Sequence, residues 1–402
     1  MKHKRILCFS EAVTLAHVAR PIVLARSWQR FGFESVFACD VRYNYFMKGE
    51  TWQSFPLNSV SSQKFMRNLA LGKPVYDVTT LRSYVAEDIK LIEYVKPDLI
   101  VGDFRLSLSV SARLVGIPYA AITNAYWSPF CLDKTFPLPV LPLSRYLPLP
   151  IAQPIFDIFK HIAFSWHCHP LNQLKNEHGL APFGSDLRSA YTDADYILYA
   201  DAPDMFPVTE LPQQHRFLGP VLWSPPVEKP SWWNDLPVDK PIVYLTLGSS
   251  GSPRVLEMIL KVLANQPVTV IASTAGAIAS VTPAANIYVT DYLSGDDAAA
   301  RSSLVICNGG SPTSQQALAC GVPVLGIASN MDQFMNMAAI ERSRAGVLLR
   351  ADRVNEKAVH EALMRLIHDP SYRHHALELA DAFSRLNSGQ AFCNFVSEVF
   401  HD

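Results

Sequence analysis

The sequence of 402 residues lacks an excess of charge of either sign and lacks paired cysteines. Its 35 basic and 36 acidic residues leave a formal net charge of −1, so bulk charge gives no attraction for nucleic acid. The seven cysteines are scattered and form no C-x-x-C pair, which indicates reduced thiols in a cytoplasmic compartment. His167, Cys168 and His169 are adjacent in sequence and cannot converge on one tetrahedral ion, so we expect no structural metal site.

Long uninterrupted hydrophobic runs are also absent. Uncharged windows such as 114–132 and 302–331 are broken every few residues by Gly, Pro or Asn. Buried parallel strands account for such windows better than transmembrane helices do. The start MKHKRILCFSEAV has the basic residues of a signal peptide, but its apolar run ends at Glu11 and no small-residue cleavage pattern follows. We therefore interpret RILCFS as the first strand of a domain.

Apolar strand-like runs alternate with helical stretches twice along the chain. RILCFS, SVFACD, DLIVGD and GIPYAAIT show this pattern in the first half, and PIVYLTLG, VTVIAS, NIYVTDY, LVICN and VPVLGIA show it in the second. Such alternation is typical of α/β domains with parallel sheets, and a chain of this length exceeds what one core usually supports. We expect Rossmann-like domains over 1–218 and 241–385, a proline-rich linker over 219–240, and a final helix over 386–402 that returns to the first domain.

The segment 124–170 stands apart because it is rich in proline, aliphatic and aromatic residues, as in FPLPVLPLSRYLPLPIAQPIF. Its prolines are expected to prevent a long helix at first. The composition fits the wall of a hydrophobic pocket or a lid that touches a membrane. Ordinary core packing accounts for about half of these side chains.

The most specific local pattern is VICNGGSPTSQQALACGVPVLG, residues 305–326. An apolar strand ends at two glycines, where the lack of side chains lets a ligand approach the backbone. Ser311 is a good N-cap and Pro312 suits the first helical position, which predicts a helix over 312–320. The free N–H groups and the positive dipole end of that helix favour an anion such as phosphate. An ordinary strand-loop-helix turn is the alternative.

The second half resembles the nucleotide-sugar-dependent family 1 glycosyltransferases, which include plant and animal UDP-glycosyltransferases and bacterial antibiotic glycosyltransferases. The family pattern H-G-G-x-G-T-x-x-x-A-L is matched at 308–318, its G-V-P at 321–323 and its D-Q-x-x-N at 332–336, with the spacing kept. The stretches YLTLGSSG and VTDYL are similar to further donor-binding segments of the family. The resemblance implies the GT-B fold, an α/β architecture of two Rossmann-like domains that face each other across a cleft.

The first half resembles the same family through AHVARPIVLARSWQRFGFESVFA, similar to its G-H-V-x-P helix start, and through PDLIVGD, a strand that ends in aspartate. The resemblance implies that His17 is the general base and that Asp103 orients it. Histidine suits this task because it titrates near neutral pH, and a carboxylate on the other ring nitrogen fixes the tautomer. The alternatives are that His17 only packs or caps a strand-helix junction and that Asp103 is ordinary turn chemistry.

The resemblance also implies the reaction and the donor site. We expect inverting, metal-independent transfer of a sugar from a UDP- or dTDP-sugar to a hydroxyl of a hydrophobic small molecule or lipid. No cofactor, no metal and no nucleic acid partner are expected, and the protein would be cytoplasmic or peripheral to a membrane. The implied donor contacts are Ser249, Ser250, Tyr292, Asn308, Gly309, Gly310, Ser311, Thr313, Ser314, Asp332, Gln333 and Asn336.

Two positions depart from the family pattern. Asn308 replaces the histidine that commonly contacts the donor diphosphate, and an amide can donate a hydrogen bond but carries no charge. Pro312 removes one N–H from the helix end and is expected to push Ser311 toward an extended conformation. These departures motivate a second hypothesis, a catalytically silent relative that serves as an activator or scaffold. A third hypothesis is a sugar-nucleotide epimerase or hydrolase on the same fold.

Overall fold

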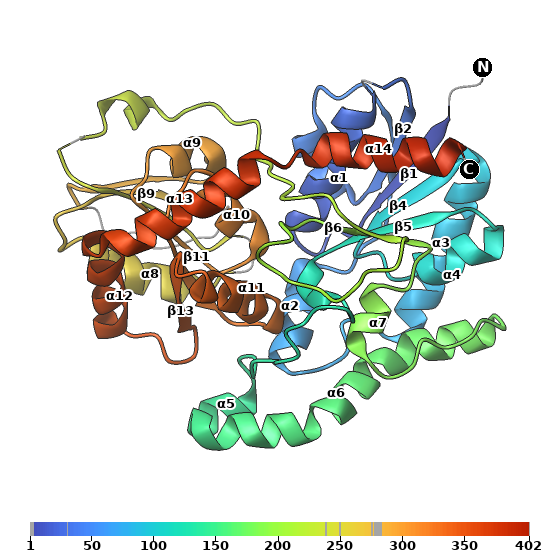
Figure 1. Cartoon of the computed structure of the whole chain (residues 1–402), viewed down its shortest axis with the longest axis horizontal. Coiled ribbons are helices and arrows are strands. Elements are labelled where there is room, and N and C mark those ends of the chain that lie inside the picture. The colour runs from blue at the N-terminus through green and yellow to red at the C-terminus, as the bar shows by residue number, and fades with distance from the viewer. Residues whose placement is uncertain are drawn as a thin grey trace. The chain divides into compact units, whose positions relative to one another are not determined.

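The computed structural model describes residues 4–29, 31–237, 239–248, 251–274, 276 and 284–401. The chain divides into two compact units, each built on one parallel sheet (Figure 1). The first unit combines the residues up to Thr135 with Pro150–Val221 and the carboxy-terminal residues from Leu386. The second unit combines Phe136–Leu149 with Leu222–Arg385. The α/β fold expected from the alternation of strand-like and helical runs is confirmed.

The sheet of the first unit has seven strands in the order β3-β2-β1-β4-β5-β6-β7. Strands are added first on one side of β1 and then, from β4 onward, on the other, so the winding reverses between β1 and β4. In sheets of this kind, ligands bind outside the carboxyl ends of the strands at the reversal. The strands are β1 (Arg5–Ser10), β2 (Glu34–Cys39), β3 (Gln53–Pro56), β4 (Leu99–Asp103), β5 (Tyr119–Thr123), β6 (Tyr196–Tyr199) and β7 (His215–Phe217).

The last helix of the chain belongs to the first unit, where it packs against α1. The rings of Trp28 and Phe392 have centroids 4.9 Å apart, and Phe395 meets Tyr196 at 5.2 Å. These buried aromatic contacts hold the chain end on the first sheet. The helices of this unit are α1 (Ala16–Gln29), η1 (Val41–Met47), α2 (Ser62–Ala70), α3 (Val78–Val95), α4 (Leu108–Val115), η2 (Ala125–Trp127), α6 (Leu149–Glu177), α7 (Leu187–Tyr191) and α14 (Ser388–His401).

The sheet of the second unit has six strands in the order β10-β9-β8-β11-β12-β13, with the reversal between β8 and β11. Its central strands are short apolar runs without exposed residues, as expected for parallel strands covered by helices. The strands are β8 (Ile242–Thr246), β9 (Thr269–Ser273), β10 (Ile287–Thr290), β11 (Leu304–Cys307), β12 (Val324–Ala328) and β13 (Gly346–Arg350). The helices are α5 (Pro142–Tyr146), η3 (Ser231–Asp235), α8 (Pro253–Leu263), α9 (Gly295–Ala300), α10 (Ser311–Ala319), α11 (Met331–Arg342), α12 (Glu356–His368) and α13 (Pro370–Ser384).

The predicted first domain, 1–218, is interrupted, because residues 136–149 pack in the second unit. The backbone N–H of Val140 donates to the carbonyl of Ser329 at 2.8 Å. The guanidinium of Arg350 donates to the carbonyl of Leu138 at 2.6 Å. These bonds supply partners for the backbone of a proline-rich stretch that forms no strand of its own.

The predicted linker, 219–240, lies largely in the second unit, which resumes at Leu222. It is also not irregular throughout. Residues Ser231–Asp235 form the 3-10 turn η3, in which Trp233 is buried. Arg301 donates to the carbonyl of Trp233 at 2.6 Å and lies over its ring, 4.9 Å from the centroid. Proline excludes a long helix here but not a short packed turn.

Candidate active site

The reversal of the first sheet brings the two predicted catalytic residues together. β1 and β4 are adjacent, with Ser10 in register with Asp103, and His17 lies in the first turn of α1, which follows β1. The Nδ1 atom of His17 lies 2.8 Å from Oδ1 of Asp103, whose side chain is fully buried, whereas 18% of the histidine side chain remains exposed. The carboxylate therefore meets one ring nitrogen, as an orienting partner does. The catalytic roles of both residues stay a prediction.

A third residue, which the sequence reasoning missed, completes this centre. Arg20 lies one turn after His17 on α1 and is buried. Its Nε donates to Oδ2 of Asp103 at 2.8 Å and its Nη2 donates to Oδ1 at 2.7 Å. Burial by itself would lower the pKa of Arg20, but the adjacent Asp103 outweighs it and leaves that pKa raised. The arginine is therefore a fixed cation beside the histidine.

Phe104, directly after β4, has a backbone φ of 59°, a conformation that is rare for residues other than glycine. Its ring stacks on the imidazole of His17, with centroids 4.7 Å apart and planes inclined by 14°. The ring of Phe104 also meets that of Tyr191 at 5.5 Å. The unusual backbone angle places an aromatic ring against the partly buried side chain of His17, the predicted base. Backbone outliers of this kind gather at functional sites.

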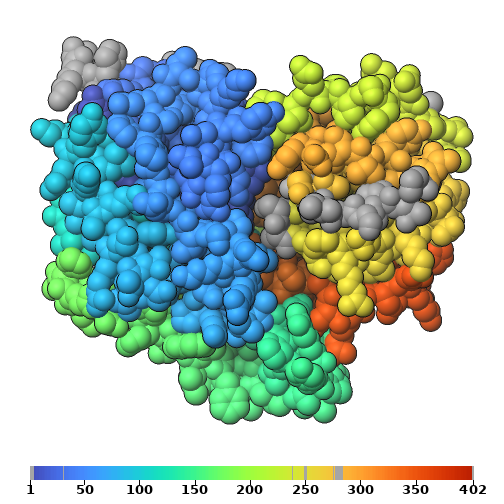
Figure 2. All heavy atoms as spheres, turned by 180° about the vertical axis from the view of Figure 1, so that it is seen from behind, coloured from blue at the N-terminus to red at the C-terminus, as the bar shows by residue number. Residues whose placement is uncertain are grey.

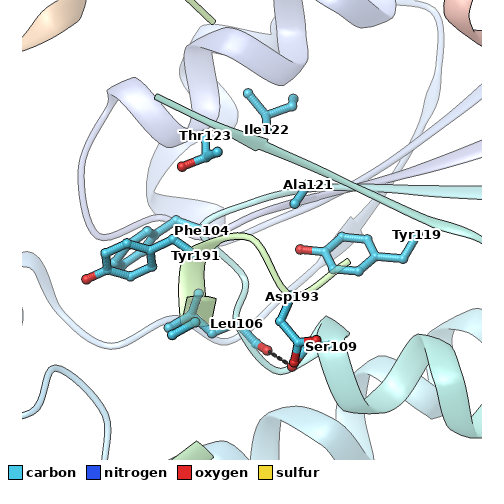
Figure 3. A pocket seen from close by; sticks show the side chains of 10 residues that line it. Phe104, Leu106, Ser109, Tyr119, Ala121, Ile122, Thr123, Tyr191 and Asp193 are labelled. Carbon is cyan, nitrogen blue, oxygen red and sulfur yellow. Dashed lines mark hydrogen bonds between the residues drawn. The ribbon is translucent and has the colours of Figure 1, made fainter. Parts of the chain in front are cut away.

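A small pocket lies beside the ring of Phe104 (Figure 3). Its walls are mainly apolar and aromatic, with Ser109, Thr123 and Asp193 as polar residues. The wall residues come from the loop after β4, from α4, from β5, from α7 and from the residues that follow α7, and not from the segment 124–170 that composition favoured. The lining residues are Phe104, Leu106, Ser109, Tyr119, Ala121, Ile122, Thr123, Ala190, Tyr191 and Asp193.

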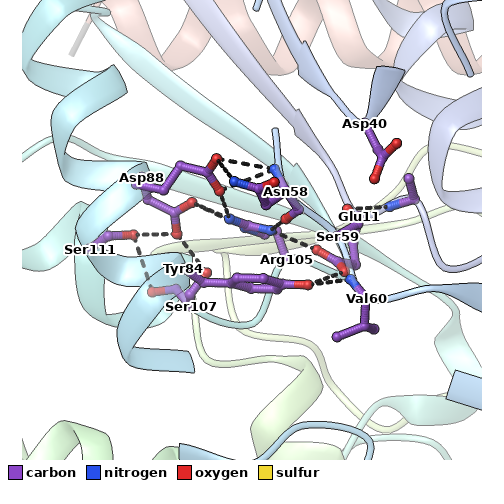
Figure 4. Close-up of polar contacts among 12 residues, drawn as sticks. Glu11, Asp40, Asn58, Ser59, Val60, Tyr84, Asp88, Arg105, Ser107 and Ser111 are labelled. Atoms are coloured by element: carbon purple, nitrogen blue, oxygen red, sulfur yellow. Dashed lines mark hydrogen bonds and ion pairs between the residues drawn. The ribbon is translucent and has the colours of Figure 1, made fainter. Parts of the chain in front are cut away.

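A buried ionic network supports the loops on which this centre is built (Figure 4). Arg105, the residue after Phe104, is fully buried and pairs with Glu11 at 2.9 Å and with Asp88 at 2.9 Å. Its guanidinium also lies 3.5 Å from the ring centroid of Tyr84. Burial raises the pKa of Glu11, and the attraction of Arg105 opposes only part of that effect. The network ties the end of β1 to the end of β4, because Glu11 N–H also donates to the carbonyl of Asp103 at 3.1 Å.

The helix that follows the glycine turn of the second unit begins one residue earlier than the sequence predicted. The helix α10 spans Ser311–Ala319 with Gly310 as its N-cap, and Gly310 has the extended conformation that was expected for Ser311. Pro312 is the second helical residue, and its missing N–H remains tolerable there because the first turn has no intrahelical partner. Gly309 has φ of 80°, and a Cβ on it would come within 2.7 Å of Met337 Cγ. Only glycine fits that position.

Side chains of the predicted donor set hold this turn from within. Asn336 is fully buried, and its Nδ2 donates to the carbonyl of Gly309 at 2.8 Å and to Oγ of Ser314 at 2.9 Å. The hydroxyl of Ser314, also fully buried, donates to the carbonyl of Gly310 at 3.0 Å. Asn308 accepts the N–H of Gly310 at 3.0 Å. Three side chains predicted to contact the donor thus brace the backbone of the turn.

Gln333 is similarly engaged. Its Oε1 accepts the N–H of Ser329 at 2.8 Å and that of Asn330 at 3.3 Å, within a capping box that starts α11. Because the side chain is buried and its Oε1 already accepts these bonds, a further bond that Oε1 accepts from a sugar hydroxyl would compete with the helix cap. The neighbouring Asp332 lies in the first turn of the helix and is half-buried.

The remaining predicted donor residues are more accessible or lie elsewhere. Tyr292, after β10, is 36% exposed. Thr313 is half-buried in the first turn of α10, and Ser311 at its start is buried. Ser249 and Ser250 lie outside the described residues.

The proline-rich segment forms a surface feature that the sequence reasoning did not predict. α6 continues through Pro154 and Pro170 over 29 residues, although proline was expected to prevent a long helix there. Among the described helices, none has the combination of length and apolarity that a membrane span requires. Figure 2 shows this segment, in green, at the surface. The large apolar side chains of α6 with more than half of their surface exposed are Ile151, Ile158, Phe159, Ile162 and Trp166.

Two doubly wound parallel sheets, one with a His–Asp pair at its reversal and one with a glycine turn before a helix, define the class of GT-B glycosyltransferases. The spinosyn rhamnosyltransferase SpnG complexed with thymidine diphosphate has this fold. It matches with a TM-score of 0.69 at 15% identity, covering 98% of this chain and 100% of that one. Residues 255–387 match the family model described as "Erythromycin biosynthesis protein CIII-like, C-terminal domain".

The relatives by sequence are much closer. A PGL/p-HBAD biosynthesis glycosyltransferase of Mycobacterium tuberculosis (strain H37Ra) is 50% identical over 99% of this chain and 92% of its own length. A PGL/p-HBAD biosynthesis rhamnosyltransferase of Mycobacterium bovis (strain BCG) is 48% identical over 96% and 85%. An "inactive PGL/p-HBAD biosynthesis glycosyltransferase" of the same strain is 47% identical over 65% and 71%. The chain belongs to this family, and it is a glycosyltransferase.

Proposed function

We propose that this glycosyltransferase moves a sugar from a UDP- or dTDP-sugar to a hydroxyl of a hydrophobic small molecule or lipid, with inversion at the anomeric carbon and without a metal ion. The observation that carries the proposal is the His17–Asp103 pair, held at 2.8 Å at the reversal of the first sheet. The dTDP alternative is supported by the thymidine diphosphate in the related fold and by the rhamnosyltransferase among the relatives.

The chemistry follows from the two ring nitrogens of His17. With Nδ1–H donating to Asp103, Nε2 carries a lone pair that can take the proton of the acceptor hydroxyl. The acceptor oxygen forms a bond to the anomeric carbon while the bond from that carbon to the diphosphate oxygen breaks on the opposite face, which inverts the configuration. Asp103 then stabilises the imidazolium that forms.

The departing diphosphate needs stabilisation of its negative charge. The positive end of α10, reached through the turn at Gly309 and Gly310, is suited to that charge and supports transfer without a metal. The one Asp-x-Asp pattern beside the pocket, Asp193-Ala194-Asp195, is already engaged. Asp193 pairs with Lys175 at 2.6 Å, and Asp195 accepts the N–H of Tyr119 at 2.9 Å. Activity that survives EDTA supports metal independence, and activity restored only by a divalent cation contradicts it.

A hydrophobic acceptor is supported by the aromatic ring of Phe104 against His17 and by α6. The exposed apolar face of α6, from Ile151 to Trp166, supports contact with a membrane surface from which a lipid acceptor could be taken. Asp157 and Lys160 on this helix pair with each other at 2.8 Å, so they add no net charge and a neutral lipid surface is expected.

The test is release of nucleoside diphosphate from a panel of UDP- and dTDP-sugars with phenolic and lipid acceptors. Acceptor-dependent release from one donor supports the proposal. The alternative is a catalytically silent activator or scaffold, and the relative named inactive motivates it. This alternative predicts no release of nucleoside diphosphate and no change in melting temperature with any donor. Isomerised or free sugar formed without an acceptor would instead indicate an epimerase or hydrolase.

A further inference from the structure

The carboxylate of Asp103 is shared between two donors. Its Oδ1 lies 2.8 Å from Nδ1 of His17 and accepts Nη2–H of Arg20 at 2.7 Å, and its Oδ2 accepts Nε–H of Arg20 at 2.8 Å. The fork of two parallel N–H donors fixes the plane of the carboxylate. The carboxylate of Asp103 therefore cannot rotate freely, and Oδ1 is the oxygen that meets His17.

The guanidinium also lies close to the histidine itself. Nη2 of Arg20 is 3.1 Å from Nδ1 of His17, and an arginine nitrogen can donate but never accept. A proton on Nδ1 is satisfied by Asp103, which is the closer partner and the charged one. His17 and Arg20 therefore meet the same oxygen of Asp103, so the position of that oxygen depends on the arginine.

The far side of Arg20 is held as firmly. Its Nη1 donates to Oδ1 of Asn124 at 2.9 Å, and Nδ2 of Asn124 donates to Oδ1 of Asp201 at 2.9 Å. The other oxygen of Asp201 accepts the N–H of Ala125 at 2.6 Å. All three polar side chains are buried. A chain of charge-assisted bonds thus runs from the carboxyl end of β6 to the histidine.

We propose that Arg20 is a positioning residue of the transfer reaction, which fixes the orientation of Asp103 and, through it, that of the His17 ring. The proposal rests on the proposed role of His17 as the base. Arg20 touches neither substrate nor the reacting atoms and acts only through the pair.

The charged and titratable groups around His17 come from several neighbouring elements. The charged groups are Asp103 from β4, Arg20 from α1 and Asp201 after β6. The titratable neutral groups are Cys8 on β1, Tyr119 on β5 and Tyr126 in η2, all of which interact electrostatically with Asp103 or Arg20. Burial raises the pKa of Cys8 and that of Tyr119, so both stay neutral near pH 7.

The experiment compares Arg20→Gln and Arg20→Lys with the wild-type enzyme. We expect Arg20→Gln to lower kcat by about tenfold to a hundredfold with little change in donor KM, because only the base is affected. Arg20→Lys keeps the charge but loses the fork, so kcat is expected to fall in this variant as well, again with donor KM nearly unchanged. The matched control is Arg26→Gln on the same helix, whose side chain is 41% exposed and pairs with Glu50.

A double mutant separates this inference from the role of His17. If Arg20 acts through His17, then His17→Ala combined with Arg20→Gln loses no more turnover than His17→Ala alone. Additive losses of turnover in the double mutant, or a donor KM that rises as much as kcat falls in Arg20→Gln, would overturn the inference. Unchanged turnover in His17→Ala alone would overturn the proposed function as well, whatever the Arg20 variants do.

Discussion

The side-chain amide of Asn336 donates to the carbonyl of Gly309 at 2.8 Å, and so joins α11 to the glycine turn before α10. The two residues are 27 positions apart in sequence. The same Nδ2 holds the hydroxyl of Ser314 at 2.9 Å. This relationship gives the D-Q-x-x-N pattern a structural meaning, because its last residue shapes the backbone at which the diphosphate is proposed to bind.

Asn336→Ala is therefore expected to weaken donor binding without touching the base. Two buried hydrogen bonds are lost, each worth about 1 kcal/mol, so we predict a donor Kd or KM raised about tenfold or more and a lower melting temperature. The measurement is titration with dTDP and UDP, alongside steady-state kinetics. The control Asn265→Ala removes an exposed amide that donates only to the carbonyl of Lys261. Equal donor affinity in wild type and Asn336→Ala would show that the brace is unimportant for binding.

The comparison between sequence and structure shows which kinds of information a local pattern carries. His17 and Asp103 were assigned as a pair from the family resemblance, and the structure supplies the physical reason, because β1 and β4 are adjacent and parallel strands bring their carboxyl ends together. The role of Arg20 could not be predicted, since its partner Asp103 lies 83 positions away and no local sequence pattern links the two residues. The turn at Gly309 was placed to within one residue, which is the usual uncertainty of a helix end.

Other parts depended on long-range contacts or on competition between roles. The excursion of 136–149 into the second unit rests on bonds such as Ser144 to Asp352, 208 positions apart, which composition cannot reveal. Gln333 was assigned as a donor contact from the family pattern alone. Asn330 lies three residues before Gln333, and these two residue types at this spacing are typical of a capping box. The sequence alone could therefore have indicated the capping role of Gln333.

Glu11 makes the stability of the protein depend on pH in a definite direction. Burial raises its pKa above the ordinary value of 4.5, so the folded state favours the protonated form. Its contribution to stability is complete below that ordinary value and is lost as the pH rises through the raised one. We therefore expect the free energy of unfolding of the wild type, relative to Glu11→Gln, to fall as the pH rises above this ordinary value of 4.5.

The measurement is urea unfolding of both proteins across this range. A control of opposite sign is Glu177→Gln, because Arg82 lowers the pKa of Glu177 to about 2. Relative to that variant, the wild type should lose stability only as the pH falls below the ordinary 4.5. A free energy of unfolding of the wild type that rises with pH relative to that of Glu11→Gln would contradict the assignment of burial as the dominant effect on the pKa of Glu11.

The exposed face of α6 predicts binding to neutral lipid. Substituting Ile158, Phe159 and Ile162 together by serine removes three side chains that are 62%, 56% and 57% exposed. Since burial of one such side chain contributes about 1.5–3 kcal/mol, we expect vesicle binding to weaken at least tenfold while turnover of a water-soluble acceptor is unchanged. Phosphatidylcholine vesicles and co-sedimentation provide the measurement.

The matched control for α6 is Leu377→Ser, which removes an apolar side chain of similar exposure, 49%, from α13 in the second unit. It should bind vesicles like the wild type. Binding by the triple variant equal to that of the wild type would remove α6 from any contact with a membrane.

The central claim is that His17 accepts the proton of the acceptor hydroxyl, and turnover of His17→Ala measured at saturating donor tests it most directly. The claim predicts a fall in kcat of about two orders of magnitude or more, with the affinity for the nucleoside diphosphate retained. Turnover equal to that of the wild type would contradict it.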